Sequence, residues 1–163
     1  MDRLLIFLLY ISILFIIFFD INKKCIPNIL NFFLLIFCFF IRGLNNIETF
    51  FIGASTYTLP VLLLYGYISD LLKREVIGFG DIKLIIALGG LLYTPQINLL
   101  LQIYIFYLIT FLTASFFILF MVIYTFFSRT KQNLKNKEIA FSPFICISFV
   151  ILYNLNLILE FWV

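Results

Sequence analysis

Long apolar runs separated by short polar turns make up nearly the whole chain. Runs of this length are too long for typical strands and predict helices, and Pro27 and Pro95 stand where a helix should begin or stop. The predicted helices cover residues 3–19, 28–41, 49–68, 81–94, 97–127 and 141–161. We therefore predict an all-α, polytopic protein with six transmembrane helices, which form a single domain over residues 1–163.

Two of these helices have an unusual length. The run 81–94 is short for a bilayer, so we expect it to lie deep among its neighbours or to be completed by loop residues. The run 97–127 is longer than one crossing needs, so it should be tilted or project from the bilayer. Gly53 in the third helix, and Gly89 and Gly90 in the fourth, are candidates for close helix packing.

Composition supports lipid as the solvent, because 64% of the residues are hydrophobic and only 12% are charged. Nucleic-acid binding is excluded, since no basic face exists beyond the short loops. The three cysteines are scattered, and the chain has no histidine. This pattern excludes the usual zinc sites, a disulfide framework and Ser-His or Cys-His catalysis. We predict neither a metal nor a cofactor.

The basic residues predict the orientation in the membrane. The loops after the first, third and fifth helices hold nine of them, and the opposite side holds two, Arg3 and Arg42. The nine are Lys23, Lys24, Lys73, Arg74, Lys83, Arg129, Lys131, Lys135 and Lys137. Because Lys and Arg favour the cytoplasmic side, both termini should lie outside a cytoplasmic (inner) membrane.

Two acidic residues then share the cytoplasmic side. Asp20 closes the first helix, and Asp81 follows Gly78 and Gly80 at the start of the fourth. An Asp at the edge of hydrocarbon is costly and marks a candidate site. Two carboxyl groups around one water can act as general base and general acid, which suffices to cleave a peptide bond. The alternatives are an ordinary helix-end carboxylate for Asp20 and a glycine turn before a helix-start acid for Asp81.

Three segments resemble the type IV prepilin peptidases and the archaeal preflagellin peptidases, which are polytopic aspartic peptidases of the GxGD type. Residues 78–84 (Gly-Phe-Gly-Asp-Ile-Lys-Leu) look like the GxGD box with its trailing Lys. Residues 20–28 are similar to the family's other catalytic segment, an Asp followed by Ile-Pro-Asn. Residues 139–144 are similar to a Pro-containing box that opens the last helix, although Ser142 stands where Gly is usual.

The resemblance implies an intramembrane aspartic endopeptidase that removes the basic leader peptide from prepilin-like or preflagellin-like precursors. It implies that Asp20 and Asp81 are catalytic. It also implies residues that shape the site or bind substrate: Gly78, Gly80, Lys83, Pro27, Asn28 and Pro143. Larger family members carry an insert with paired CxxC motifs and methylate the new N-terminus, and this chain has neither insert nor motif. It therefore resembles the short form, without a methyltransferase.

Other interpretations remain open at this point. Lys83 could simply extend to the interface. Asp20 and Asp81 could form the proton relay of a small proton-coupled carrier, although no internal repeat is visible. A structural subunit of a pilus or secretion assembly is a third option. The precursor could be a pilin, pseudopilin, Flp-type pilin or archaellin, and the oligomeric state stays open.

The helix dipoles suggest how the two acids would share a proton. Asp81 lies at the positive end of its helix, which favours a carboxylate, whereas Asp20 lies at a negative end. Lys23 and Lys24 favour a charge on Asp20, but water should screen them if they face the cytoplasm. On this basis we expect Asp20 to carry the proton and Asp81 to act as the base.

Overall fold

The computed structural model describes residues 2–42, 46–73, 77–127 and 139–162. Within these ranges there is no β-strand, and six α-helices account for nearly all residues, which confirms the all-α prediction. The helices are α1 (Asp2–Lys23), α2 (Asn28–Arg42), α3 (Ile47–Leu72), α4 (Phe79–Leu92), α5 (Leu99–Phe127) and α6 (Ser142–Trp162). Their bounds differ from the predicted runs by no more than a few residues.

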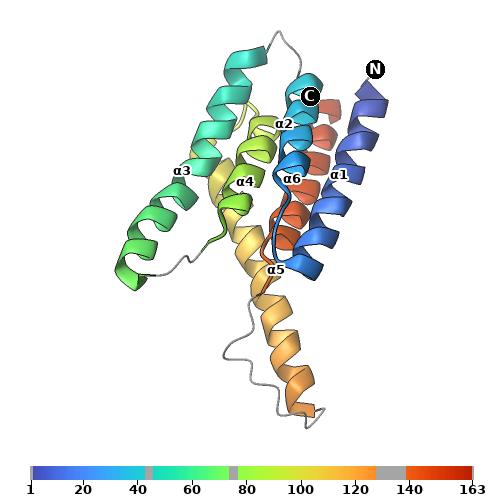
Figure 1. Ribbon diagram of the computed structural model, residues 1–163. Helices are drawn as coiled ribbons and strands as arrows, with labels where there is room; N and C mark the ends of the chain where they lie inside the picture. Colours follow the sequence, from blue (N-terminus) through green and yellow to red (C-terminus); the bar gives the residue numbers. More distant parts are fainter. Residues whose placement is uncertain (1, 43–45, 74–76, 128–138, 163) are drawn as a thin grey trace.

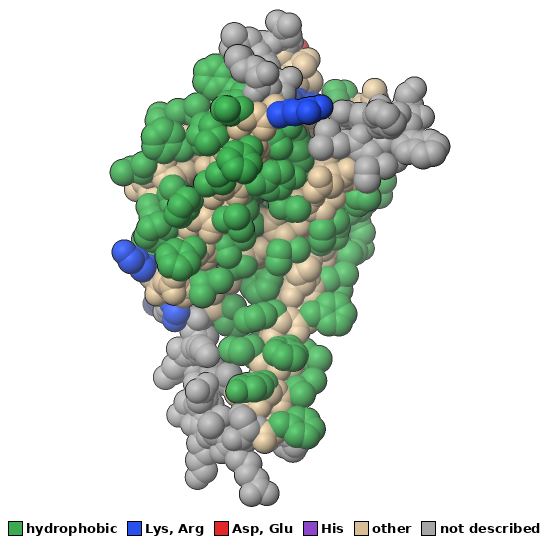
Figure 2. All heavy atoms as spheres, turned by 90° about the vertical axis from the view of Figure 1, so that its right-hand side faces the viewer, with side chains coloured by type: hydrophobic (Ala, Val, Ile, Leu, Met, Phe, Trp, Pro, Cys, Tyr) green, Lys and Arg blue, Asp and Glu red, His purple; other side chains and the backbone are tan. Residues whose placement is uncertain are grey.

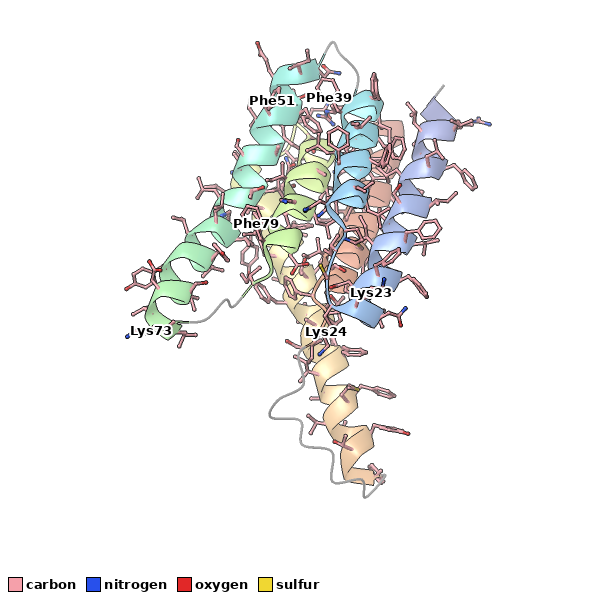
Figure 3. The ribbon with its side chains drawn as sticks, viewed as in Figure 1. Lys23, Lys24, Phe39, Phe51, Lys73 and Phe79 are labelled. Carbon is pink, nitrogen blue, oxygen red and sulfur yellow. The ribbon has the colours of Figure 1, made fainter. Side chains whose placement is uncertain are left out.

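The helices run alternately up and down, so α1 begins and α6 ends at the same end of the bundle (Figure 1). The C-terminal part of α5 extends beyond the other helices, in line with its predicted length (Figure 1). Five of the nine basic residues used for the orientation lie outside the described residues: Arg74, Arg129, Lys131, Lys135 and Lys137. Lys23, Lys24 and Lys73 lie toward the lower end of the bundle, opposite Phe39 and Phe51 (Figure 3).

Among the described residues, three helices are long and apolar enough to cross a membrane, over residues 3–23, 47–72 and 99–125. Two more, α2 and α6, contain apolar stretches that are shorter. Hydrophobic side chains cover most of the face seen in Figure 2, and only a few Lys and Arg side chains interrupt them. Large apolar residues such as Leu100 and Phe120 are exposed on α5. A surface of this kind suits lipid and not water.

The short helix α4 lies in the interior of the bundle. It packs against α2, α3 and α6, and it lies between α2 and α3 in Figure 1. Most of its residues are buried, including Ile82, Leu84 and Ile85. This confirms the prediction that the short run lies deep among its neighbours. A helix of 14 residues is ~21 Å long, so neighbours must enclose it.

Glycines allow α3 and α4 to approach closely. A Cβ atom added to Gly89 would lie 2.7 Å from the Cβ of Tyr57 and 3.1 Å from the carbonyl oxygen of Gly53. A Cβ atom added to Gly90 would overlap the ring of Phe50. The predicted packing role of Gly53, Gly89 and Gly90 is thus confirmed.

Polar side chains hold the upper end of α4. The guanidinium group of Arg42 donates hydrogen bonds to the carbonyl oxygens of Leu91 (3.4 Å) and Tyr93. The side chain of Gln102 donates to the carbonyl of Thr94 at 2.7 Å and accepts from its N–H at 3.1 Å. A cation and an amide at a helix C-terminus satisfy carbonyls that the helix leaves unpaired. These bonds fix α4 along its axis, and Asp81 with it.

Candidate active site

Asp20 lies in the last turn of α1 and is only 6% exposed. The helix ends because Lys24 adopts a left-handed conformation, with φ of 51°. The N–H of Lys24 donates to the carbonyl oxygen of Asp20 at 2.8 Å. This capping bond holds the backbone of Asp20 in a helical turn and leaves its carboxyl group to point into the bundle interior, where it is buried.

Asp81 lies in the first turn of α4 and is 8% exposed. Gly78 is the N-cap, with φ of −67° and ψ of 136°, and its carbonyl accepts the N–H of Asp81 at 3.0 Å. Gly78 therefore does not use its freedom to adopt positive φ. A Cβ atom there would lie 3.3 Å from Oδ2 of Asp81, so glycine leaves room for the carboxyl group.

The fold brings the two acids together. Their carboxyl groups, which are 61 positions apart in the sequence (81 − 20), lie close enough to interact electrostatically. The side chain of Cys146 on α6 is within electrostatic range of both. The pair thus lies where α1 and α4 each pack against α6.

The surroundings of the two carboxyl groups differ. Oδ2 of Asp20 accepts the backbone N–H of Ser142 at 3.1 Å. This N–H opens α6, where the helix has unpaired donors and a positive dipole end. The carboxyl group of Asp81 also receives a backbone hydrogen bond, from Gly78, but its Oδ1 is buried and has no hydrogen-bond partner among the described residues. A direct N–H donor stabilises a carboxylate, whereas a buried and unpartnered oxygen disfavours one.

These contacts favour the reverse of the proton assignment expected from the helix dipoles. The expectation weighed the helix to which each acid belongs and the screened charges of Lys23 and Lys24. It did not include α6, whose first N–H donates a hydrogen bond to the carboxyl group of Asp20. We therefore propose that Asp20 is the carboxylate and that Asp81 carries the proton.

The Ile26, Pro27 and Asn28 segment packs against the start of α4. A Cβ atom on Gly80 would lie 3.3 Å from the Cβ of Ile26, so glycine permits this close approach. The carbonyl oxygen of Pro27 accepts the N–H of Leu30 at 3.0 Å, and α2 begins at the next residue. The side chain of Asn28 accepts a hydrogen bond from Nζ of Lys83 at 2.8 Å.

Lys83 contacts residues on α2 and α4. Its Nζ lies 5.0 Å from the ring centroid of Phe79, in addition to its bond with Asn28. The lysine thereby ties α4 to α2. Pro143 directly follows Ser142 in the first turn of α6 and is half-buried. The predicted site residues therefore lie around one region, with Lys83 and Asn28 at its edge.

Sequence reasoning missed two contributors, the backbone of Ser142 and the side chain of Asn31. Asn31 is on α2, is 4% exposed, and donates from Nδ2 to the carbonyl oxygen of Gly80 at 3.2 Å. A polar residue in an otherwise apolar run, three positions after Asn28, was the available signal.

The described residues contain no group of three or more Cys, Asp or Glu residues that could hold a metal ion. What the two carboxyl groups can do by themselves is exchange protons with a water molecule placed between them. Because both are almost completely buried, a peptide can reach them only if the surrounding segments move apart.

Comparison with known proteins agrees with this geometry. The model of the type IV leader peptidase family matches residues 6–123, which is more than half of the chain and includes both aspartates. The matched range ends before Ser142 and Pro143. Searches of curated proteins and of solved structures found no match. The family match gives no support to a proton-coupled carrier.

Proposed function

The chain belongs to the type IV leader peptidase family, and from this premise we propose that it removes basic leader peptides from prepilin-like precursors as an aspartic endopeptidase. The observation that supports this most directly is the pairing of Asp20 with Asp81 in a buried site. Each acid comes from a segment that resembles one of the family's motifs, and both lie in the matched range.

The two acids take different roles in the proposed reaction. The Asp20 carboxylate accepts a proton from a water molecule while the water oxygen bonds to the scissile carbonyl carbon. Asp81 gives its proton to the carbonyl oxygen, which yields a tetrahedral diol. The proton held by Asp20 then passes to the leaving nitrogen, the C–N bond breaks, and a diol hydroxyl returns a proton to Asp81. The pair ends in its starting state, as general acid–base catalysis requires.

We place this chemistry at the cytoplasmic face of the inner membrane, with six crossings and both termini outside. Lys23, Lys24 and Lys73 lie toward one end of the bundle (Figure 3), Asp20 shares the last turn of α1 with Lys23, and Lys and Arg are enriched on the cytoplasmic side. The even number of alternating helices supports termini on one side. The lipid bilayer and a prepilin-like precursor are the proposed partners, within type IV pilus assembly or protein secretion.

Co-expression with candidate precursors tests the proposal. Cleavage should shorten one of the pilin, pseudopilin, Flp-type pilin or archaellin precursors by the length of its leader. Asp20→Ala and Asp81→Ala should each abolish the shift, because neither carboxyl group can fill both roles. The exposed Asp70 is a matched control, and Asp70→Asn should leave cleavage intact.

Two further readouts refine the chemistry. Mass spectrometry of the product should show a new N-terminus without a methyl group, and chelators should not inhibit cleavage by the purified protein. Cleavage that persists in a folded Asp20→Ala or Asp81→Ala variant would refute the proposed mechanism.

A further inference from the structure

Asn31 has an unusual position for an amide on an apolar helix. It is 4% exposed, and its hydrogen bond to the carbonyl of Gly80 joins α2 to the residue that precedes Asp81. Because a carbonyl oxygen can only accept, the NH2 end of the amide must face Gly80. The orientation of the Asn31 amide therefore follows from chemistry.

The other end of this amide has no partner in the part of the chain that the structure describes. Oδ1 of Asn31 is buried, and no described residue donates a hydrogen bond to it. Leaving a buried acceptor unpaired is costly, so such atoms are rare without a reason. Asp81 Oδ1 and Ser142 Oγ are likewise buried and unpartnered within the described ranges. All three residues belong to the neighbourhood of the aspartate pair, through the Asn31–Gly80 and Ser142–Asp20 bonds.

A peptide that enters this region brings hydrogen-bond donors, which could pair with the unpartnered acceptor. Its main-chain N–H groups lose water on entry, and each must find an acceptor in apolar surroundings. The nearby buried side chains Ile26, Ile82 and Cys146 offer none of comparable strength. Asn31 Oδ1 is a neutral acceptor, and it is held rigidly by the Gly80 bond.

We infer that Asn31 is a substrate-positioning residue, whose Oδ1 accepts a main-chain N–H of the precursor beside the scissile bond. The inference rests on the proposed peptidase function. The same amide holds the Gly80 turn through its NH2 group, so one side chain fixes the substrate relative to Asp81.

Synthetic precursor peptides with backbone esters provide the test, because an ester replaces one N–H with an oxygen that cannot donate. Esters are placed one at a time on both sides of the cleavage site. In the wild-type protein one position should lower kcat/KM about 10-fold to 100-fold, the cost of leaving the acceptor unpaired. In Asn31→Leu the all-amide peptide should be cleaved more slowly, and the ester at that position should cost less than about twofold.

Two further variants separate the role of Oδ1 from general effects on folding. Asn31→Thr keeps a polar side chain, but its hydroxyl lies one bond closer to the backbone than Nδ2 and it has no oxygen at the place of Oδ1, so the folded variant should lose the ester sensitivity. Asn28→Leu removes the neighbouring bond between α2 and Lys83. Its ratio of all-amide to ester cleavage should equal that of the wild type, whatever its absolute cleavage rate.

An ester penalty that is equal in wild type, Asn31→Leu and Asn31→Thr would overturn the inference and would point to a water molecule as the partner of Oδ1. Failure of the wild-type protein to cleave any all-amide precursor peptide would instead refute the proposed function, and the inference with it.

Discussion

Replacement of each aspartate by asparagine should reveal which acid is charged. Both variants should lose cleavage, but Asp20→Asn should destabilise the fold, and Asp81→Asn should change its stability little. The reason is the contact of each carboxyl group. Asp20 accepts the Ser142 N–H at 3.1 Å, whereas Asp81 Oδ1 has no partner in the described part of the chain.

The size of the effect follows from the hydrogen bond to Ser142. A bond to a charged group contributes about 1.5–3 kcal/mol and a neutral one about 0.5–1.5 kcal/mol, so changing the carboxylate to an amide should cost about 1–1.5 kcal/mol. Loss of the charge at the N-terminus of α6 adds about 0.3–1 kcal/mol. Asn is a neutral mimic of a protonated Asp, so Asp81→Asn should stay within about 1 kcal/mol of the wild type. At about 2–4 °C per kcal/mol, Asp20→Asn should unfold several degrees earlier.

The cysteines of the chain provide the assay. Cys38 and Cys146 are buried and Cys25 is exposed, so a fluorogenic maleimide reports unfolding in a Cys25→Ser background. Asp70→Asn, at an exposed position, is the matched control and should not shift the midpoint. A lower midpoint for Asp81→Asn than for Asp20→Asn would show that Asp81 carries the charge, and the argument from α6 would fail.

Two further predictions concern topology and packing. A membrane-impermeant maleimide should label the exposed Cys25 only from the cytoplasmic side, and in Cys25→Ser protein an Asn46→Cys label should react only from outside; the opposite pattern would invert the orientation. Gly89→Ala should cost about 1–3 kcal/mol of stability by overpacking against Tyr57. Gly66→Ala meets no atom within 4 Å and should be neutral or stabilising by up to about 1 kcal/mol, so equal midpoints for the two alanine variants would contradict the packing argument.

Local patterns were sufficient to predict the helices, because each apolar run and each Pro or Gly acts on its own neighbours. The same patterns predicted the burial of α4, since a short apolar run must be covered by longer ones. The packing of Gly53 against Gly89 was also predictable, because small residues permit close contact wherever they face another helix. Asp20 and Asp81 could be singled out because an acid beside an apolar run is costly wherever the run packs.

The surroundings of those acids depended on contacts between distant segments. The Ser142–Asp20 bond joins residues 122 positions apart, and the Asn31–Gly80 bond joins residues 49 positions apart. No periodicity or composition indicates which helix N-terminus will meet which carboxyl group. A dipole argument limited to α1 and α4 therefore assigned the shared proton to Asp20, whereas the packing of α6 against α1 favours Asp81. The charge on a buried acid is set by every group around it, and those groups come together only when the helices pack.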